Sequence, residues 1–257
     1  MNELTRKQRE INQRDELILN VSRALFIEHG YHNVTMDLIA KEVEYSKGTI
    51  YQHYASKEEI ISALCMRFSD MLSQWFVEIS DNKDIPAYLK MLMIMESQFV
   101  IHEYASADHD LLTLFKSQAF SSKVNEQILH DMNCKVEAII KLVHNIVRTA
   151  EASNELQMQS PANVDSITMG CWAMIEGTFE IADKHAYDKG GFTAKQIKQV
   201  LRANCFLFLK GCGWQDIPLN ASGELTLTDQ DKNNLNQFKT YCRDQIDDLN
   251  RQSQSVH

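Results

Sequence analysis

The residues with the most distinctive chemistry lie in one short segment, residues 35–57. Cationic, hydroxyl and amide side chains follow each other closely there, namely Lys47, Thr49, Tyr51, Gln52, His53 and Lys57. Such groups donate to or accept from the base edges and phosphates of DNA. Gly48 lies among them and has no side chain, so a partner's surface can approach the backbone closely. The segment therefore predicts a surface that binds nucleic acid.

Helix start and stop signals divide this region into four helices. A first helix runs from about Asp15 to a stop at Gly30, and Thr35 is the N-cap of a short second helix. Ser46 is the N-cap of another short helix. A capping-box pair, Ser56 with Glu59 three residues later, then opens a long helix. We expect the link between the two short helices to be only a few residues long.

The two short helices cannot bury their apolar faces by themselves, so they must pack on longer helices. We expect Leu25 and Leu64 to support them, with these apolar positions turned inward: Ile39, Ala40, Val43, Ile50 and Tyr54. The opposite side of the second short helix then carries Lys47, Gly48, Thr49 and Gln52. This arrangement predicts a three-helix helix-turn-helix whose outer face suits the major groove of DNA.

The rest of the chain is also predicted to be helical. Only 9 Gly and 3 Pro occur in 257 residues, which favours long uninterrupted helices. Apolar residues recur at helical spacing over about 86–104, 108–115, 121–151, 161–184, 193–213 and 228–249. Thr193 with Gln196 forms a second capping box. The fold class expected is all-α, with an N-terminal helix-turn-helix joined to a C-terminal helical bundle.

The predicted domain organisation has four parts. They are an N-terminal basic arm (1–11), a helix-turn-helix DNA-binding domain (12–72), a helical ligand-binding and dimerisation domain (73–213) and a C-terminal helical extension (214–257). The extension ends in a helix with a narrow apolar stripe, which favours a packing role over a specific partner site.

Charge and composition limit the other assignments. The net charge is −9, and residues 1–64 alone carry eight basic and ten acidic side chains, so bulk charge does not predict DNA binding and only the placement of cations supports it. The six cysteines form no C-x-x-C pair, and reduced core thiols are expected. No apolar run has the length of a signal or a membrane span, so we expect a cytoplasmic protein without a membrane partner.

The stretch Ser46-Lys-Gly-Thr-Ile-Tyr-Gln-His-Tyr54, with Ile39-Ala40 before it and Ser56-Lys57-Glu58 after it, resembles the DNA-binding signature of the tetracycline-repressor family. The resemblance covers roughly residues 12–72. It implies an all-helical homodimeric transcriptional regulator, in the simplest case a repressor, that places two recognition helices in successive major grooves of an operator. By the same resemblance, the residues that contact or position DNA are Thr35, Lys47, Gly48, Thr49, Tyr51, His53, Tyr54 and Lys57.

One residue departs from the family pattern. Many members have glycine in the turn between the two short helices, where this chain has Glu44. A non-glycine residue at positive φ costs about 1 kcal/mol. Either the turn differs slightly or the fold absorbs this cost. The carboxylate also brings negative charge near the DNA phosphates and should weaken attraction to the operator.

Resemblance in the C-terminal body is architectural and rests on no motif. Helices at about 161–184 and 193–213 are long and apolar, and we expect them to pair with a second copy in a four-helix bundle. Several methionine and aromatic residues either line a pocket for a small-molecule effector or form ordinary hydrophobic core, and the sequence favours neither alternative. These candidate lining residues are Met71, Trp75, Met95, Phe99, Trp172, Met174 and Phe179.

Catalytic and metal motifs are missing from the sequence, so we predict no enzyme, no cofactor and no metal site. There is no G-x-S-x-G elbow, phosphate-binding glycine loop or H-E-x-x-H, and no Glu-x-x-His accompanies Glu176 and Glu180. Two alternatives stay open. One is a helical metal- or ligand-binding protein without DNA function, and the other is a DNA-binding factor of the same fold that serves chromosome organisation or cell division.

Overall fold

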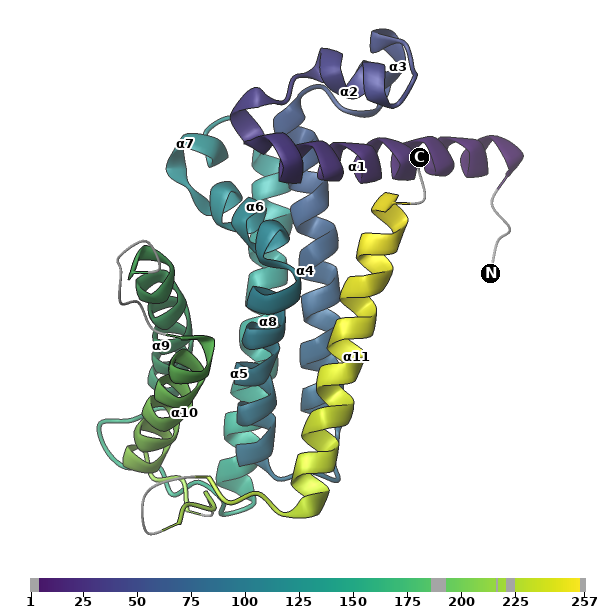
Figure 1. The fold of residues 1–257 in the computed structure, drawn as a ribbon. Helices are drawn as coiled ribbons and strands as arrows, with labels where there is room; N and C mark the ends of the chain where they lie inside the picture. The colour runs from purple at the N-terminus through teal and green to yellow at the C-terminus, as the bar shows by residue number, and fades with distance from the viewer. Residues whose placement is uncertain (1–4, 186–192, 216, 221–224, 255–257) are drawn as a thin grey trace. The chain divides into compact units, whose positions relative to one another are not determined.

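A computed structural model describes residues 5–185, 193–215, 217–220 and 225–254. Its helices (Figure 1) are α1 (Arg6–Asn33), α2 (Met36–Glu42), α3 (Lys47–His53), α4 (Lys57–Asp81), α5 (Ala87–Tyr104), α6 (Ser106–Lys116), α7 (Gln118–Ser121), α8 (Glu126–Ala152), α9 (Val164–His185), α10 (Ala194–Gly211) and α11 (Asp229–Gln254). Extended structure among these residues is limited to two isolated β-bridges. The all-α prediction, including the extra C-terminal helix, is confirmed.

The helices pack into two compact units. Unit 1 holds the described residues of Met1–Met71, Tyr104–Lys135 and Arg243–His257, and unit 2 holds those of Leu72–Glu103 and Val136–Cys242. Unit 1 therefore contains the predicted helix-turn-helix together with α6 and α7. Helices α4, α5, α8 and α11 each contribute residues to both units, α5 by its last residue alone. The four-part division expected from the sequence stays a prediction.

Helix α1 is longer than the apolar pattern indicated. It begins at Arg6, where the Thr5 hydroxyl caps it by accepting from the Gln8 amide at 3.2 Å. The cap at Thr5 sets the start of this helix, ahead of the apolar pattern. The basic residues Arg6, Lys7 and Arg9 therefore lie on the helix, where they are exposed. Gly30, with φ of 75°, interrupts the helical conformation near the C-terminal end, as the sequence predicted for this glycine.

A buried ion pair joins α1 to α6 inside unit 1. The Arg23 guanidinium donates to both carboxylate oxygens of Asp108, at 2.6 and 2.5 Å, and both residues are only 5% exposed. The same guanidinium donates to the side-chain oxygen of Asn250 on α11 at 2.8 Å. Breaking a buried pair of this kind costs about 3–5 kcal/mol, because the remaining charge is left without compensation. The pair therefore fixes α1 against α6.

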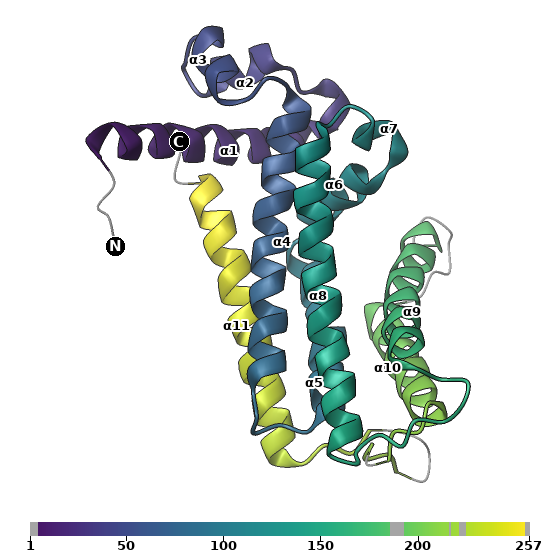
Figure 2. The ribbon, with the colours of Figure 1, turned by 180° about the vertical axis from the view of Figure 1, so that it is seen from behind.

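The core of unit 2 is built around α5. Every residue from Ala87 to Ser97 is buried, which is why this helix shows no apolar stripe. Helices α9 and α10 lie side by side in Figures 1 and 2. They approach closely because Gly170 has no side chain: a Cβ atom there would come within 2.4 Å of the Phe208 ring. The Thr193–Gln196 capping box at the start of α10 is present, as predicted.

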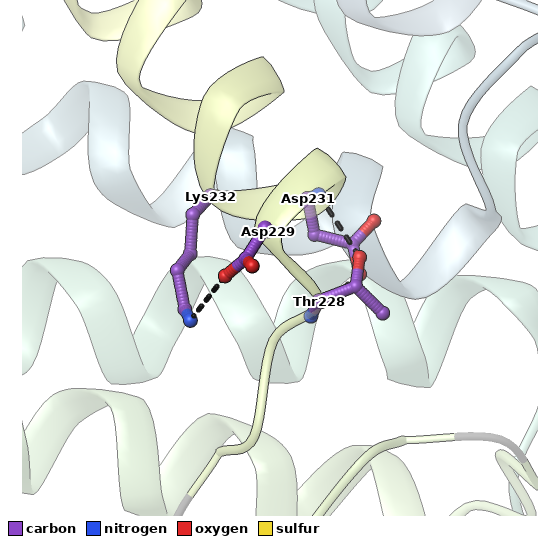
Figure 3. Close-up of polar contacts among 4 residues, drawn as sticks. All are labelled: Thr228, Asp229, Asp231 and Lys232. Atoms are coloured by element: carbon purple, nitrogen blue, oxygen red, sulfur yellow. Dashed lines mark hydrogen bonds and ion pairs between the residues drawn. The ribbon is translucent and has the colours of Figure 1, made fainter.

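Helix α11 begins with a reciprocal cap, shown in Figure 3. The Thr228 hydroxyl accepts from the Asp231 amide at 3.1 Å, and the Asp231 carboxylate accepts from the Thr228 amide at 3.2 Å. Tyr88 of α5 also donates its hydroxyl to Asp231, at 3.1 Å. Lys232 and Asp229 add an exposed ion pair at 3.0 Å. The cap fixes the start of α11 on the core of unit 2.

None of the helices described has both the length and the apolar character that a bilayer crossing requires.

Candidate nucleic-acid interface

The helix-turn-helix begins with two capped short helices in unit 1. Thr35 caps α2 by accepting from the Leu38 amide at 3.2 Å, and Ser46 caps α3 by accepting from the Thr49 amide at 3.1 Å. Helix α2 packs against both α1 and α3. The caps satisfy amides that a short helix leaves unpaired, so they set where α3 begins.

Apolar side chains hold the two short helices on their support. Four of the five side chains predicted to face inward are buried: Ile39 and Ile50 are 0% exposed, Ala40 4% and Val43 5%, whereas Tyr54 is half-buried. Leu25 of α1 and Leu64 of α4, the expected supports, are 8% and 5% exposed. Burying aliphatic side chains of this size contributes about 1.5–3 kcal/mol each. The orientation of α3 is therefore fixed by its inner face.

The turn between α2 and α3 passes through Glu44 in the left-handed region, with φ of 59°. This settles the question raised by the sequence: the turn keeps the backbone conformation that favours glycine, and the chain carries the strain of a side chain there. The Glu44 amide donates to the Lys41 carbonyl at 3.1 Å, and the Tyr45 amide to the Ala40 carbonyl at 3.1 Å. These bonds close α2 and hold the turn. Glu44 is exposed, so its charge faces solvent.

The outer face of α3 is open. Lys47, Gly48, Tyr51 and Gln52 are exposed, and Tyr51 keeps 52% of its surface. Thr49 is half-buried, and its hydroxyl lies 2.9 Å from that of Ser46. A Cβ atom at Gly48 would meet nothing in the chain closer than the Ser46 hydroxyl at 3.8 Å. The fold therefore has no steric need for glycine at this position.

Lys47 is exposed but paired. Its ammonium lies 2.5 Å from the Asp37 carboxylate on α2, and both side chains are more than 60% exposed. An exposed ion pair of this kind contributes about 0–1 kcal/mol, so an incoming phosphate or base can replace it. The pair holds Lys47 at the junction of α2 and α3.

His53 and Tyr54, at the C-terminal end of α3, both interact with the Asp15 carboxylate of α1. The Nδ1 atom of His53 lies 3.3 Å from the Asp15 carboxylate, and its side chain is 11% exposed. Burial raises the pKa of Tyr54 well above its ordinary value, and its hydrogen bond to Asp15 raises it further. Both side chains therefore anchor α3 on α1 as the structure stands.

Lys57 is likewise engaged within unit 1. Its ammonium donates to the carbonyls of Tyr31 and Val34 at 2.7 and 2.9 Å and lies 4.2 Å from the centre of the Tyr31 ring. Burial lowers the pKa of the Lys57 ammonium, although Glu58 opposes this shift. The Tyr31 hydroxyl donates to Glu58 at 2.6 Å. Lys57 thus holds the end of α1 against the start of α4.

The predicted DNA-contact residues thus fall into two sets. Lys47, Gly48, Thr49, Tyr51 and Gln52 belong to the outer side of α3, whereas Thr35, His53, Tyr54 and Lys57 cap or anchor helices. Sequence reasoning missed the partners Asp15, Asp37 and Tyr31. Asp37 is ten residues before Lys47 and belongs to a different helix, so no helical spacing connects the two. The helical spacing of Asp37 points instead to Lys41, four residues later. Asp15 contacts His53 and Tyr31 contacts Lys57, and these pairs are too far apart in the sequence to show a periodic signal.

The residues proposed as a ligand pocket are dispersed. Met71 belongs to unit 1 and the other six to unit 2. Phe99 and Phe179 meet edge to face with ring centres 5.3 Å apart, and Trp172 donates its ring N–H to Glu176 at 2.9 Å. Met174 is half-buried, and Trp75 is fully buried with no hydrogen-bond partner for its ring nitrogen among the residues described. The pocket stays a prediction.

One apolar hollow lies within unit 2. Its volume is about 20 Å³, and it is lined by Met91, Leu92, Ile94, Met95, Cys171, Ile175, Cys205, Phe206 and Leu209. Pockets for drug-sized ligands have volumes of about 300–1,000 Å³, so the hollow must expand before it holds more than about a water molecule. Of the predicted lining residues, Met95 is the one found here. Within the described ranges no three His, Cys, Asp or Glu side chains are grouped as metal ligands would be.

Residues 18–64 match the family described as "Bacterial regulatory proteins, tetR family". The chain is also 42% identical over 50 residues to the HTH-type transcriptional regulator UidR of Escherichia coli K12. This alignment covers 20% of the chain and 26% of UidR, so the chain matches about a quarter of that curated relative's length. The resemblance predicted from the Ser46–Tyr54 stretch is confirmed. UidR is named as a regulator and not as an enzyme.

Solved structures extend the likeness of fold. Salmonella enterica GusR is similar with a TM-score of 0.58 and 21% identity, covering 81% of this chain and 100% of GusR. A complex of SmeT with triclosan is similar with a TM-score of 0.62 and 16% identity, covering 84% of this chain and 100% of SmeT. At these identities the two structures show a common fold, which includes the C-terminal helical part.

Proposed function

We propose that this chain, which belongs to the tetR family of bacterial regulatory proteins, is a homodimeric operator-binding repressor whose DNA affinity is set by a small-molecule effector. The observation that carries the proposal is the open outer face of α3, with Lys47, Gly48, Tyr51 and Gln52 exposed above a buried apolar base. A short helix supported in this way fits the major groove of DNA.

The proposed roles on α3 follow from side-chain chemistry. Lys47 and Gln52 donate to or accept from base edges, and the Thr49 hydroxyl does so once it turns from Ser46. Gly48 gives the phosphodiester backbone or a base edge room beside the helix. The Tyr51 hydroxyl suits a phosphate. Of the anchored residues, His53 and Tyr54 position α3, Thr35 caps α2, and Lys57 holds the end of α1 against the start of α4. Any phosphate contact by these side chains is made at the expense of an internal one.

The proposed dimer forms through α9 and α10. Large apolar side chains are exposed on both helices: Met169 by 53%, Ile181 by 55%, Val200 by 46% and Leu207 by 67%. Two copies that place these residues against each other would bury them in a four-helix bundle. A two-fold axis then sets the spacing of the two α3 helices on a palindromic operator.

The effector part of the proposal rests on the fold and on a relative. The SmeT structure is a complex with triclosan, so a protein of similar fold binds a small molecule. In this chain the hollow between α5, α9 and α10 touches both helices of the proposed dimer surface. A ligand that enlarges it would change how α9 and α10 pair. Coupling between effector and DNA is then about 1–3 kcal/mol, the usual range for such sites.

The test is selection of bound duplexes from a random pool by the full chain, followed by affinity measurement over a range of salt concentrations. We expect a palindromic site bound at least about 10³-fold more tightly than random DNA. Thr49→Ala should lower this ratio, and Gly48→Ala should weaken specific binding without loss of stability. Equal loss on specific and random DNA from Thr49→Ala would contradict a base-reading role.

A second measurement separates a repressor from a chromosome-organising factor. Genome-wide occupancy should fall on a few promoter sites, with transcription from those promoters rising when the gene is deleted. Many dispersed sites without promoter preference would reject the repressor assignment while keeping DNA binding.

A further inference from the structure

Unit 2 contains a buried carboxylate, Glu96 of α5, at the centre of a group of cations. Its side chain is 0% exposed, and three cations surround it: Lys198 and Arg202 of α10 and Lys239 of α11. The ammonium nitrogens of Lys198 and Lys239 both lie 2.9 Å from Oε2, and the Arg202 Nε donates to Oε1 at 2.5 Å. We call these four residues the Glu96 cluster.

The Glu96 cluster carries more positive charge than its carboxylate needs. One well-placed cation is enough to compensate a buried carboxylate, and each further cation adds repulsion and desolvation. Across the described residues, Glu96 is the one carboxylate within 4.0 Å of any of these three cations. The cluster therefore has an excess of two positive charges, in a chain whose net charge is −9.

The excess charge is accessible. The side chains of Lys198, Arg202 and Lys239 are 34%, 32% and 23% exposed, whereas Glu96 lies wholly beneath them. Glu96 thus orients the three cations without covering them. An anion arriving from solvent would meet donors that are already arranged, which lowers the entropic cost of binding.

Apolar and aromatic groups adjoin the same cations. The Lys198 ammonium lies 5.0 Å from the centre of the Phe99 ring, and Phe179 meets Phe99 edge to face. His102 stacks on Phe179 with ring centres 4.7 Å apart. The apolar hollow uses the same two helices: Met95 precedes Glu96 on α5, and Cys205 lies about one turn beyond Arg202 on α10.

We propose that the Glu96 cluster is the polar end of a binding site for an amphipathic organic anion, a carboxylate with an apolar or aromatic body. The carboxylate binds Lys198, Arg202 and Lys239, and the body enters the hollow among flexible side chains such as Met91 and Met95. This inference rests on the proposed function, because it names the chemical class of the effector. It also brings in α11, which supplies Lys239 and continues into unit 1.

The experiment measures binding of decanoate and 2-naphthoate to the DNA-free full chain by isothermal titration calorimetry, with decan-1-ol and 2-naphthol as neutral controls. At least one carboxylate should bind about tenfold more tightly than its uncharged counterpart, because charge-assisted hydrogen bonds are the strong ones. The preference should shrink as salt is raised. If neither carboxylate binds better than its control, the inference is wrong.

Three variants test the position of the site. Lys198→Gln should weaken carboxylate binding about fivefold or more, since it removes a charged donor. Glu96→Gln should strengthen it, because the cations lose their internal competitor. Lys210→Gln is the matched control, an exposed lysine on α10 outside the cluster, and should leave binding unchanged. Equal affinities for Lys198→Gln and Lys210→Gln overturn the proposal, even if Glu96→Gln fails to fold.

Operator binding by the same preparations separates this inference from the proposed function. If the ligand-free protein binds its selected operator but takes up neither carboxylate, the repressor proposal stands and the anion site is rejected. If the carboxylates bind with the expected variant pattern and no DNA is bound, the anion site stands and the repressor proposal is rejected.

Discussion

The Lys47 ammonium is ion-paired to the Asp37 carboxylate at 2.5 Å, so a cation that we propose contacts DNA has an internal competitor on the neighbouring helix. Asp37→Asn removes that competitor and one negative charge near the phosphates. We expect affinity for all duplexes to rise several-fold at low salt, since an exposed pair contributes at most about 1 kcal/mol. The gain should fade as salt increases.

Asp229→Asn is the matched control for this change. Asp229 pairs with Lys232 in an exposed ion pair of the same kind, at the start of α11. The Asp229→Asn substitution should leave DNA affinity unchanged. A gain of equal size from both substitutions would mean that net charge, and not release of Lys47, is responsible. Fluorescence anisotropy with a labelled operator and a random duplex measures both.

Glu44, with φ of 59°, should be improved by glycine. Glu44→Gly relieves a strain of about 1 kcal/mol, part of which is offset by greater freedom of the unfolded chain. We therefore expect unfolding by urea to require up to about 1 kcal/mol more free energy, with the m-value unchanged. Glu44→Gln keeps the Cβ atom and removes only the charge, so it should raise DNA affinity as much as Glu44→Gly without the gain in stability.

Lys57 is expected to act mainly through stability. Lys57→Met removes the donor to the carbonyls of Tyr31 and Val34, and leaving partly buried acceptors unpaired costs about 1–3 kcal/mol. The midpoint of thermal unfolding should fall accordingly. If instead stability is unchanged and the salt dependence of DNA binding drops by about one charge, Lys57 is a phosphate ligand and its internal contacts are incidental.

The sequence predicts local features of this protein well and distant ones poorly. The caps at Ser46 and Thr193, the turn at Gly30 and the inward positions on α2 and α3 all follow from neighbours within one or two helical turns. The pairs Asp15–His53 and Arg23–Asp108 join residues far apart in the chain and leave no periodic trace. Glu96 is hidden for the same reason, because its three cations come from α10 and α11.

The Glu96 cluster should make the free energy of unfolding depend on pH in the acidic range. Burial raises the pKa of Glu96, but Arg202, Lys239 and Lys198 together outweigh burial and hold the pKa below its ordinary value. A lowered folded-state pKa contributes stability that is present above the unfolded pKa, near 4.3, and lost as pH falls through the folded value. We expect the urea midpoint of the wild type to fall below about pH 5, and that part of the fall to be missing in Glu96→Gln.

The exposed apolar residues of α9 and α10 give the last prediction. Leu207 is 67% exposed, and in the proposed dimer it is covered by the second copy. Leu207→Glu places a charge in that interface, which is costly unless the charge is paired, so the dimer should dissociate at micromolar concentrations. Sedimentation velocity measures the change, and operator affinity should drop with it because half-sites are then bound singly. Val77→Glu, at an apolar residue 42% exposed on α4, is the control and should stay dimeric. A dimer that survives Leu207→Glu would place the pairing surface elsewhere.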